Sequence, residues 1–259
     1  MTRTRVSHAV RLARHWLAPV ADPVNAARGL IGYWQYVKDW RSYQALPGAE
    51  PITFVDSFPQ VHDRTSTSTI DPHYFYTNNW AMRRVIAIAP ALHIDIGSQT
   101  IFASLLASTV NTVFVDYRPL HVTLSGMHSL GGDLLGLPFA DGALASLSCL
   151  HVIEHVGLGR YGDPLDPSGT YRAVRELVRV LAPGGSLLLA TPVGRPRLCF
   201  NAHRIHVAED IRAMAPELEL REFSGIDDNG TLHEGVELSA FKDCEYACGF
   251  FWLRRPVGL

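Results

Sequence analysis

The sequence lacks the features of a membrane-spanning or disulfide-stabilised protein. No apolar run near its start approaches the roughly 18 residues that a transmembrane helix needs. The longest such run, from Trp16 to Ala21, is interrupted by Pro19, so a signal peptide is not expected. Of the four cysteines, Cys244 and Cys248 are separated by three residues and have no matching pair elsewhere, which argues against a metal or redox site. These absences predict a cytoplasmic protein.

The chain also lacks a strong net charge. Its formal charge of −2 gives no reason to expect nucleic acid or another polyanion as a partner. The charge is uneven, however, because residues 1–41 carry seven basic side chains against two acidic ones. Residues 1–45 are predicted to be helical with breaks at Pro19 and Pro23. For the basic stretch around Arg11, three interpretations stay open: a helix that packs on the core, one that lies on an anionic membrane, and one that binds an acidic partner.

The pattern of elements predicts two parts, a helical extension with a linker over residues 1–69 and one α/β domain over residues 70–259. Residues 46–72 are rich in proline, threonine and serine and are predicted to be loop. Alternating apolar and helical segments then predict a parallel sheet with an antiparallel ending. The strands are expected at 92–96, 112–116, 144–150, 186–191, 218–223 and 246–253, and the helices at 81–89, 99–108, near 119–127, 168–181 and 207–214.

Two of these apolar runs end in acidic residues with the spacing of a nucleotide-binding βαβ unit. The first leads to Asp95 and Gly97, and the second ends in Asp116, 21 positions after Asp95. In such a unit the first strand delivers a carboxylate and a glycine to its carboxyl end, and the second delivers a carboxylate for two ribose hydroxyls. A dinucleotide dehydrogenase is disfavoured, because no G-x-G-x-x-G follows the first strand to hold a pyrophosphate.

Further motifs follow in order. Residues 132–134 precede the strand expected at 144–150, residues 151–155 follow that strand, and residues 181–185 close the next helix in a turn that opens the strand expected at 186–191. In this order they resemble the class I S-adenosylmethionine-dependent methyltransferases, especially the type 11 group and a bacterial branch of methyltransferase-like proteins. The resemblance covers roughly residues 70–255 and includes the aromatic segment 73–76 and the segment 154–164. It implies a doubly wound, mostly parallel, seven-stranded Rossmann-like sheet, here preceded by the N-terminal helical extension.

The resemblance implies a binding site for S-adenosyl-L-methionine. Gly97 and its loop face the methionine part of the cofactor, where Asp95 helps to hold the ammonium group. Asp116 accepts hydrogen bonds from both ribose hydroxyls, and Asp133, with the backbone of Leu134, contacts the adenine edge. A carboxylate has enough lone pairs for such bidentate contacts. The implied cofactor-binding residues are Asp95, Gly97, Ser98, Asp116, Asp133 and Leu134.

The segment from His151 to His155 permits three interpretations. His-x-x-Glu-His is a zinc-peptidase signature, but that motif needs the middle of a long helix, whereas a strand precedes and glycines follow here. Some methyltransferases bind a divalent metal through a related Glu-x-x-Glu-His, which this chain departs from at His151. In the third interpretation, which we expect, no metal is bound and Glu154 and His155 fix a turn. The ligands of any metal bound here are predicted to be His151, Glu154, His155 and His206.

Methyl transfer is a direct displacement that needs alignment and, for a hydroxyl acceptor, a base. His151 is the first candidate base and His155 the second, with Glu154 beside them. The loop from Arg160 to Asp166 is predicted to form the acceptor wall together with two tyrosines, which alternatively hold the preceding helix to the core. Aromatic faces with Asp and Arg suit a sugar, so O-methylation of a small molecule or glycan is expected. The predicted acceptor contacts are Tyr74, Tyr76, Arg160, Tyr161 and Asp163.

A non-catalytic alternative stays open. Gln99 and Ile101 stand where the methyltransferases usually have further glycines. The chain could therefore be a degenerate methyltransferase fold that serves as a binding or scaffold subunit, with its basic N-terminal helices as the docking surface. The oligomeric state is not predicted.

Overall fold

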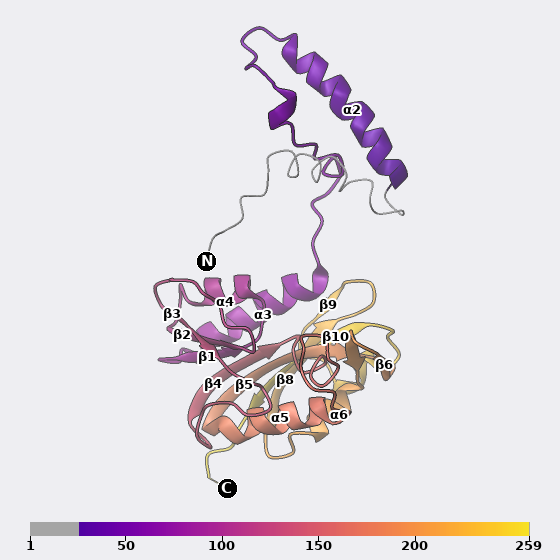
Figure 1. The fold of residues 1–259 in the computed structure, drawn as a ribbon. Helices are drawn as coiled ribbons and strands as arrows, with labels where there is room; N and C mark the ends of the chain where they lie inside the picture. The colour runs from indigo at the N-terminus through magenta and orange to yellow at the C-terminus, as the bar shows by residue number, and fades with distance from the viewer. Residues whose placement is uncertain (1–25, 259) are drawn as a thin grey trace. The chain divides into compact units, whose positions relative to one another are not determined.

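A computed structural model describes residues 26–258 and divides the chain into two units, Met1–Thr69 and Ile70–Leu259 (Figure 1). The described residues of the first unit include helix α2 (Ala26–Gln44) and, in the segment after it, the short 3-10 helix η1 (Phe54–Asp56). The prediction of a helix after Pro23 followed by loop is confirmed. The basic stretch around Arg11 lies outside the described residues. None of the described helices is long and apolar enough to cross a membrane.

An eight-stranded sheet forms the centre of the second unit, in the order β3-β2-β1-β4-β5-β10-β8-β9. The first five strands in this order are parallel, and β10 pairs antiparallel with both β5 and β8. The predicted parallel sheet with an antiparallel ending is confirmed, with the two-residue β9 added at one edge. The strands are β1 (His93–Ile96), β2 (Thr112–Asp116), β3 (Met127–Gly131), β4 (Leu144–Leu150), β5 (Leu181–Val193), β8 (Glu219–Ile226), β9 (Leu232–His233) and β10 (Ala247–Arg254).

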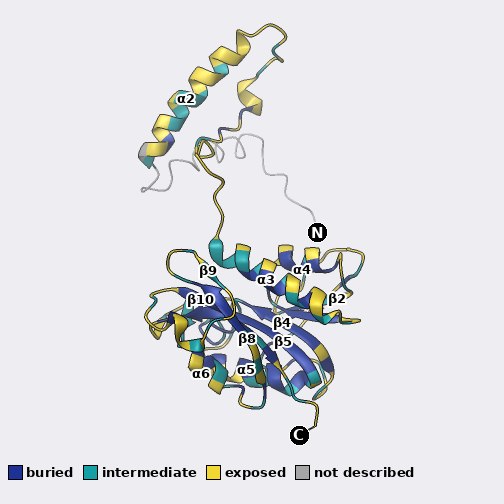
Figure 2. Ribbon diagram, turned by 180° about the vertical axis from the view of Figure 1, so that it is seen from behind, coloured by how far each residue is buried: buried dark blue, intermediate teal, exposed yellow. Residues whose placement is uncertain are grey.

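Helices cover both faces of this sheet (Figure 1). Helices α3 (Pro72–Ile88) and α4 (Thr100–Leu106) cover one face, and α5 (Gly169–Val180) and α6 (Ala208–Ala213) cover the other. Strand side chains alternate between the two resulting cores: Leu187 and Leu189 pack with α5, whereas Leu188 packs with α3 and α4. The central strands are buried on both sides (Figure 2). A short hairpin, β6 (Arg197–Cys199) and β7 (His203–Ile205), lies outside the main sheet.

The helix predicted near residues 119–127 is wrong. Residues 117–126 form an irregular connection, and the chain then enters β3, which the sequence did not predict. Gly126 has a φ of +77°, and a Cβ there would lie 2.5 Å from the carbonyl oxygen of Ala107. A glycine in this conformation together with Pro119 stops a helix, so β2 and β3 pair in parallel through a loop.

Two element boundaries also differ from the prediction. The aromatic segment expected before a helix at 81–89 lies within α3, which starts at Pro72 because Asp71 caps it. The carboxylate of Asp71 accepts hydrogen bonds from the backbone of His73 and Tyr74. The segment Ala182 to Gly185, expected as a turn, belongs to β5, which pairs irregularly with β4 there.

Candidate functional site

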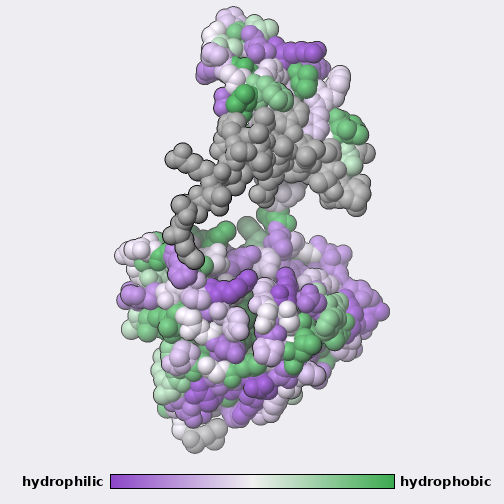
Figure 3. Space-filling view, viewed as in Figure 1, coloured by the Kyte–Doolittle hydropathy of each residue, from purple (hydrophilic) through white to green (hydrophobic). Residues whose placement is uncertain are grey.

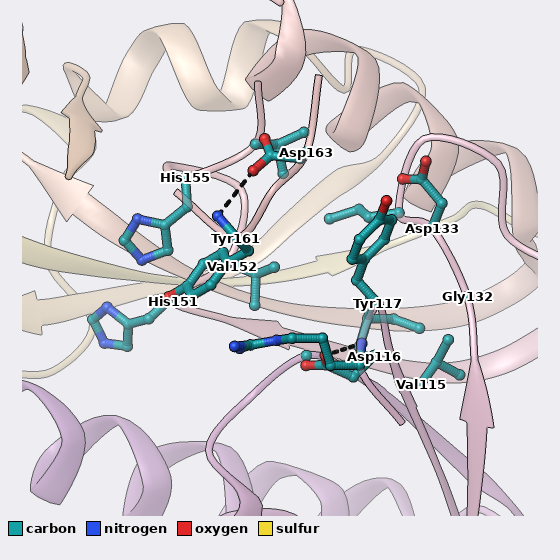
Figure 4. A pocket seen from close by; sticks show the side chains of 15 residues that line it. Val115, Asp116, Tyr117, Gly132, Asp133, His151, Val152, His155, Tyr161 and Asp163 are labelled. Atoms are coloured by element: carbon teal, nitrogen blue, oxygen red, sulfur yellow. Dashed lines mark hydrogen bonds between the residues drawn. The ribbon is translucent and has the colours of Figure 1, made fainter. Parts of the chain in front are cut away.

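A pocket of about 750 Å³ lies at the carboxyl ends of the parallel strands. The chain passes from β1 to β2 on one side and reaches β4 on the other side of β1, and such a switch in strand order leaves a ligand-binding crevice. We call this space pocket A (Figure 4). Its two histidines lie at one end, Asp133 lies at the other, and Asp116 lies between them. Pocket A is lined by Ile96, Gly97, Val115, Asp116, Tyr117, Arg118, Gly132, Asp133, Leu134, His151, Val152, His155, Val156, Tyr161 and Asp163.

Glycine at position 97 keeps pocket A open. Gly97 has a φ of +65°, which side chains rarely adopt. A Cβ there would lie 3.3 Å from Val152 and 3.7 Å from Oδ2 of Asp116, in the space before that carboxylate. Asp116 is held in place because its Oδ1 accepts a hydrogen bond of 2.7 Å from the backbone of Arg118. The site thus offers a fixed carboxylate oxygen beside a backbone that a ligand can approach closely.

The far end of pocket A combines a second carboxylate with apolar walls. Oδ1 of Asp133 accepts a hydrogen bond of 2.8 Å from the backbone of Leu135, which orients the carboxylate. Gly132 allows this turn to approach β2, since a Cβ there would lie 2.6 Å from Val115. Val115 and Leu134 line the same end. Apolar side chains beside a polar acceptor suit a flat heterocycle that carries an amino group.

Asp95 and Ser98 are buried behind pocket A and do not line it. Ser98 donates a 2.6 Å hydrogen bond to Asp95 and accepts one from the backbone of Leu150. Ser148 also donates to Asp95 and contacts the ring of His93 at 2.9 Å, so this polar network joins β1 to β4. Oδ2 of Asp95 has no partner among the described residues. Burial raises the pKa of Asp95 to about 6, against the opposing effect of the serine hydrogen bonds.

The residues that replace the usual glycines leave pocket A open. Neither Gln99 nor Ile101 lines it. The side chain of Gln99 instead accepts a 3.0 Å hydrogen bond from Asn78, which ties the start of α4 to α3. Ile101 points to solvent with 68% of its surface exposed.

Residues 151–155 form a tight turn directly after β4, so the long helix that a zinc-peptidase motif needs is absent. His151 has a φ of +59°, and its backbone donates a 2.8 Å hydrogen bond to Ala190. A left-handed residue other than glycine costs about 1–3 kcal/mol and is typical of functional sites. Within the described residues, no group of three or more His, Cys, Asp or Glu is arranged to hold a metal ion.

Glu154 is almost fully buried between two histidines. Its Oε1 lies 3.6 Å from Nδ1 of His151 and 3.6 Å from Nε2 of His155. Burial favours the neutral acid, but the two histidines outweigh it and lower the pKa of Glu154. Because this buried carboxylate interacts with both rings, the protonation equilibria of His151, Glu154 and His155 are coupled.

The two histidines differ in protonation. Burial opposes the charged form of His151, but Cys248 and Glu154 outweigh it and raise its pKa above the ordinary value. Nε2 of His151 lies 3.5 Å from the sulfur of Cys248 and 3.3 Å from the hydroxyl of Thr77. For His155, burial is the largest cause and lowers the pKa. His155 is therefore the neutral ring at pH 7 and His151 the charged one.

The tautomer of His155 follows from its neighbour. Its Nδ1 lies 2.5 Å from the carbonyl oxygen of Ala202, which can only accept, so Nδ1 carries the hydrogen. Nε2 then holds the lone pair of the neutral ring. The same carbonyl accepts a 3.2 Å hydrogen bond from Arg160. The turn between β6 and β7, which contains Ala202, thus orients both side chains.

A second cavity, which we call pocket B, adjoins pocket A and measures about 1050 Å³. The two share His151 and His155 as a common wall. Pocket B has one aliphatic lining residue, Ala202, whereas several line pocket A. Its lining consists of Asp71, His73, Tyr74, His151, Glu154, His155, Arg160, Asn201, Ala202, His203 and Tyr246.

Stacked rings form much of the wall of pocket B. The ring of Tyr246 stacks on that of His73 and is tilted against that of His203, each with a centroid distance of 5.0 Å. Tyr74 packs against His151 at 4.9 Å. Rings that stack on one another leave their nitrogen and oxygen atoms available at the edges for hydrogen bonding.

The predicted acceptor residues are distributed over three places. Tyr74 and Arg160 line pocket B, whereas Tyr161 and Asp163 line pocket A. Tyr76 lines neither and packs against the core beneath α3, as in its predicted alternative role. The sequence reasoning missed six residues of pocket B as site residues, and nothing local marks them, because the start of α3, the turn between β6 and β7 and the residue before β10 bring them together. These residues are Asp71, His73, Asn201, Ala202, His203 as an acceptor contact, and Tyr246.

The loop at 160–163 reaches across pocket A. The guanidinium of Arg118 lies 4.6 Å from the ring centre of Tyr161, and that of Arg160 lies 5.2 Å from it. Asp163 accepts a 2.7 Å hydrogen bond from the backbone of Gly157, which closes the loop on itself. Arg204 of β7 fastens the same region by donating to the carbonyl oxygens of Val156 and Asp166.

Comparison with known proteins supports the fold. The model of a family described as a Caenorhabditis protein of unknown function, DUF268, matches residues 142–229. No curated protein matches the chain. YcgJ from Bacillus subtilis is similar in structure, with 14% identity over 71% of this chain and 100% of its own, and a TM-score of 0.51. A Galdieria sulphuraria protein assigned as a sarcosine dimethylglycine methyltransferase has 13% identity over 71% and 86%, and a TM-score of 0.52.

The fold is that of the S-adenosylmethionine-dependent methyltransferases. The same fold also carries other chemistry. The [4+2]-cyclase SpnF is similar over 71% of this chain and 82% of its own, with 15% identity and a TM-score of 0.53. Function therefore has to be argued from the pockets.

Proposed function

We propose that the protein is an S-adenosylmethionine-dependent methyltransferase that methylates a hydroxyl group of a small polar acceptor, such as a sugar or glycan. The observation that carries this proposal is the wall shared by the two pockets. Pocket A has the carboxylates and apolar sides that suit the cofactor, pocket B has polar ring edges, and His151 and His155 stand between them. A transfer reaction needs two such adjoining sites with a proton acceptor at their junction.

The residues of pocket A fit the cofactor. Asp116 presents a fixed carboxylate for the two ribose hydroxyls, and Gly97 leaves the room in front of it. Asp133 and the backbone of Leu134 are assigned to the adenine edge, with Val115 beside the ring. When bound, S-adenosylmethionine supplies an electrophilic methyl group on a sulfonium. We assign Asp95 and Ser98, which lie behind the wall, to supporting the loop that contains Gly97.

His155 is the better base of the two histidines. Its lowered pKa keeps it neutral at pH 7, and its Nδ1 is bonded to Ala202, so Nε2 carries the lone pair, with the guanidinium of Arg160 3.5 Å away. Nε2 would take the proton of the acceptor hydroxyl, and S-adenosylmethionine held in pocket A would supply the methyl group to the acceptor oxygen. His151 is held in its charged form by Glu154 and Cys248, and it positions the carboxylate between the rings.

The acceptor proposal rests on the composition of pocket B. A lipid tail needs an aliphatic wall, and Ala202 is the one aliphatic residue that lines pocket B. A polyhydroxylated acceptor instead matches the ring edges and the side chains of Arg160 and Asn201. The site offers hydrogen-bond donors and acceptors around its rim, as recognition of several hydroxyl groups requires.

Calorimetric titration with S-adenosylhomocysteine tests the donor site. We expect micromolar binding that Asp116→Ala abolishes, because the ribose loses its bidentate acceptor. Asp243→Ala, which changes an exposed aspartate outside both pockets, is the matched control and should bind as the wild type does. No binding of the wild type at millimolar ligand would overturn the proposal.

A panel of sugars and nucleotide-activated sugars, with product detected by mass spectrometry, tests the transfer. Formation of a methyl ether that is lost in His155→Ala is the expected result. The scaffold alternative predicts retained binding of S-adenosylhomocysteine with no methylation of any acceptor.

A further inference from the structure

Helix α2 of the first unit has one face that packs and one that does not. On its packed side, Gly32 contacts the loop so closely that a Cβ there would lie 2.6 Å from Val61. Asp39 pairs with Arg64 at 3.1 Å and accepts a 2.6 Å hydrogen bond from Gln35. These contacts fix the orientation of the helix within its own unit.

The other face of α2 is apolar and exposed. Leu30, Trp34 and Val37 recur at the i, i+4 and i+7 spacing that aligns side chains along one side of a helix. Ile31 borders them. Their exposed fractions are large for such side chains: Leu30 66%, Ile31 70%, Trp34 67% and Val37 40%. Hydrophobic side chains are visible on the surface of this unit in Figure 3. An exposed apolar patch of this kind marks an interaction surface.

Basic side chains share this face. Arg41 continues the spacing of the apolar residues, and Lys38 lies beside them with its ammonium 5.5 Å from the ring centre of Trp34. The one acidic residue of α2, Asp39, is on the packed side, bonded to Arg64. No acidic side chain therefore lies on the exposed face of α2 to pair with Lys38 and Arg41 of a second copy. Apolar anchors with a tryptophan and snorkelling cations instead match an anionic lipid surface.

We propose that α2 lies on anionic membranes, with Leu30, Ile31, Trp34 and Val37 inserted at the interface and Lys38 and Arg41 at the lipid headgroups. Insertion of the apolar side chains supplies the hydrophobic contribution. Each basic residue near the surface adds attraction to anionic lipid that weakens with salt. The proposal is independent of the enzymatic one, because none of these residues belongs to either pocket.

Co-sedimentation of the full chain with vesicles tests this surface. We expect binding to phosphatidylcholine vesicles that contain phosphatidylglycerol, and much weaker binding to phosphatidylcholine alone. Trp34→Glu should weaken binding by about tenfold or more, since it places a charge among the apolar anchors. Lys38→Gln with Arg41→Gln should weaken it roughly thirtyfold at low salt and remove most of the preference for anionic lipid. Ile86→Glu introduces the same charge at an exposed apolar position of α3 and should leave binding unchanged.

Three results would overturn the proposal. The first is no sedimentation of the wild type with anionic vesicles. The second is equal binding by the wild type and Trp34→Glu. The third is a dimer, seen by light scattering, that dissociates in Trp34→Glu while vesicles bind neither protein, which would assign this face to a second copy. Because Trp34 is exposed, its replacement should not unfold the unit, and circular dichroism checks this.

Discussion

Pockets A and B share a wall but are built differently. The ligand-facing groups of pocket A come largely from the ends of neighbouring parallel strands, which hydrogen bonds hold in register. Pocket B is assembled from the start of α3, the turn after β4, the turn between β6 and β7, and the residue before β10. A pocket on strand ends has fixed geometry, whereas one made of turns varies with the turns. In the proposed function, the cofactor binds in pocket A and the acceptor is selected in pocket B.

The largest effect on turnover is expected from a substitution in the wall that the two pockets share. His155→Ala should lower turnover by about 10²–10⁴-fold, the usual contribution of a general base, and change the affinity for S-adenosylhomocysteine by only a few-fold. Turnover of the wild type should fall as the pH drops through the lowered pKa of His155, and it should reach a plateau at higher pH, where the ring is neutral. His155→Asn keeps a donor toward Ala202 but has no base, so it should be equally inactive; an active Asn variant would remove His155 from this role.

Gly97→Val should disturb pocket A and leave pocket B unchanged. The valine needs a strained φ and fills the space before Asp116, so affinity for S-adenosylhomocysteine should fall on the order of a hundredfold. Gly136→Ala is the control, because a Cβ there meets nothing within 4 Å. Calorimetry measures both. Unchanged binding by Gly97→Val would show that the ligand does not use this end of pocket A.

The network behind pocket A makes stability depend on pH. The pKa of Asp95 is about 6 in the folded protein, above its ordinary value, so the protonated form is stabilising and this contribution is lost as the pH rises through 6. As the pH rises from about 4 to about 7, the wild type should lose on the order of 2–3 kcal/mol of unfolding free energy relative to Asp95→Asn, because asparagine does not titrate. Urea unfolding at several pH values measures this.

The same Asp95→Asn variant tests the contact that the family resemblance implies. A fall of more than about tenfold in affinity for S-adenosylhomocysteine would show that this carboxylate reaches the ligand. A constant stability difference across the pH range would contradict the raised pKa.

The smallest effect is expected at Cys248. Its removal in Cys248→Ala takes away one of the two groups that keep His151 charged, so the pKa of His151 should fall. Titration of the imidazole signals by nuclear magnetic resonance measures this, with Cys248→Ser as the variant that keeps a polar partner. Affinity for S-adenosylhomocysteine should change little. If the pKa of His151 were unchanged in Cys248→Ala, Glu154 alone would account for its raised value.

The sequence predicted pocket A far better than pocket B. Asp116 and Gly97 could be found because a buried parallel strand is a continuous apolar run, and its end is visible in the sequence. Strand β3 was missed because it lies at the sheet edge and is short and partly exposed, with no apolar run. Tyr246 and His203 could not be assigned to pocket B, since the contacts of Tyr246 with His73 and with His203 depend on long-range packing that leaves no periodic signal.

The hairpin of β6 and β7 has a consequence for how this protein could acquire new acceptors. Its turn orients His155 and Arg160 through one carbonyl and contributes Asn201 and His203 to pocket B, yet it pairs with no strand of the main sheet. Arg204 of the hairpin also fastens the loop that lines pocket A, so two contacts limit what can replace it. In the proposed function, a hairpin of another length or sequence, grafted between β5 and α6, would redesign acceptor choice, provided that one backbone carbonyl still meets Nδ1 of the histidine and an arginine still binds the carbonyl oxygens of Val156 and Asp166.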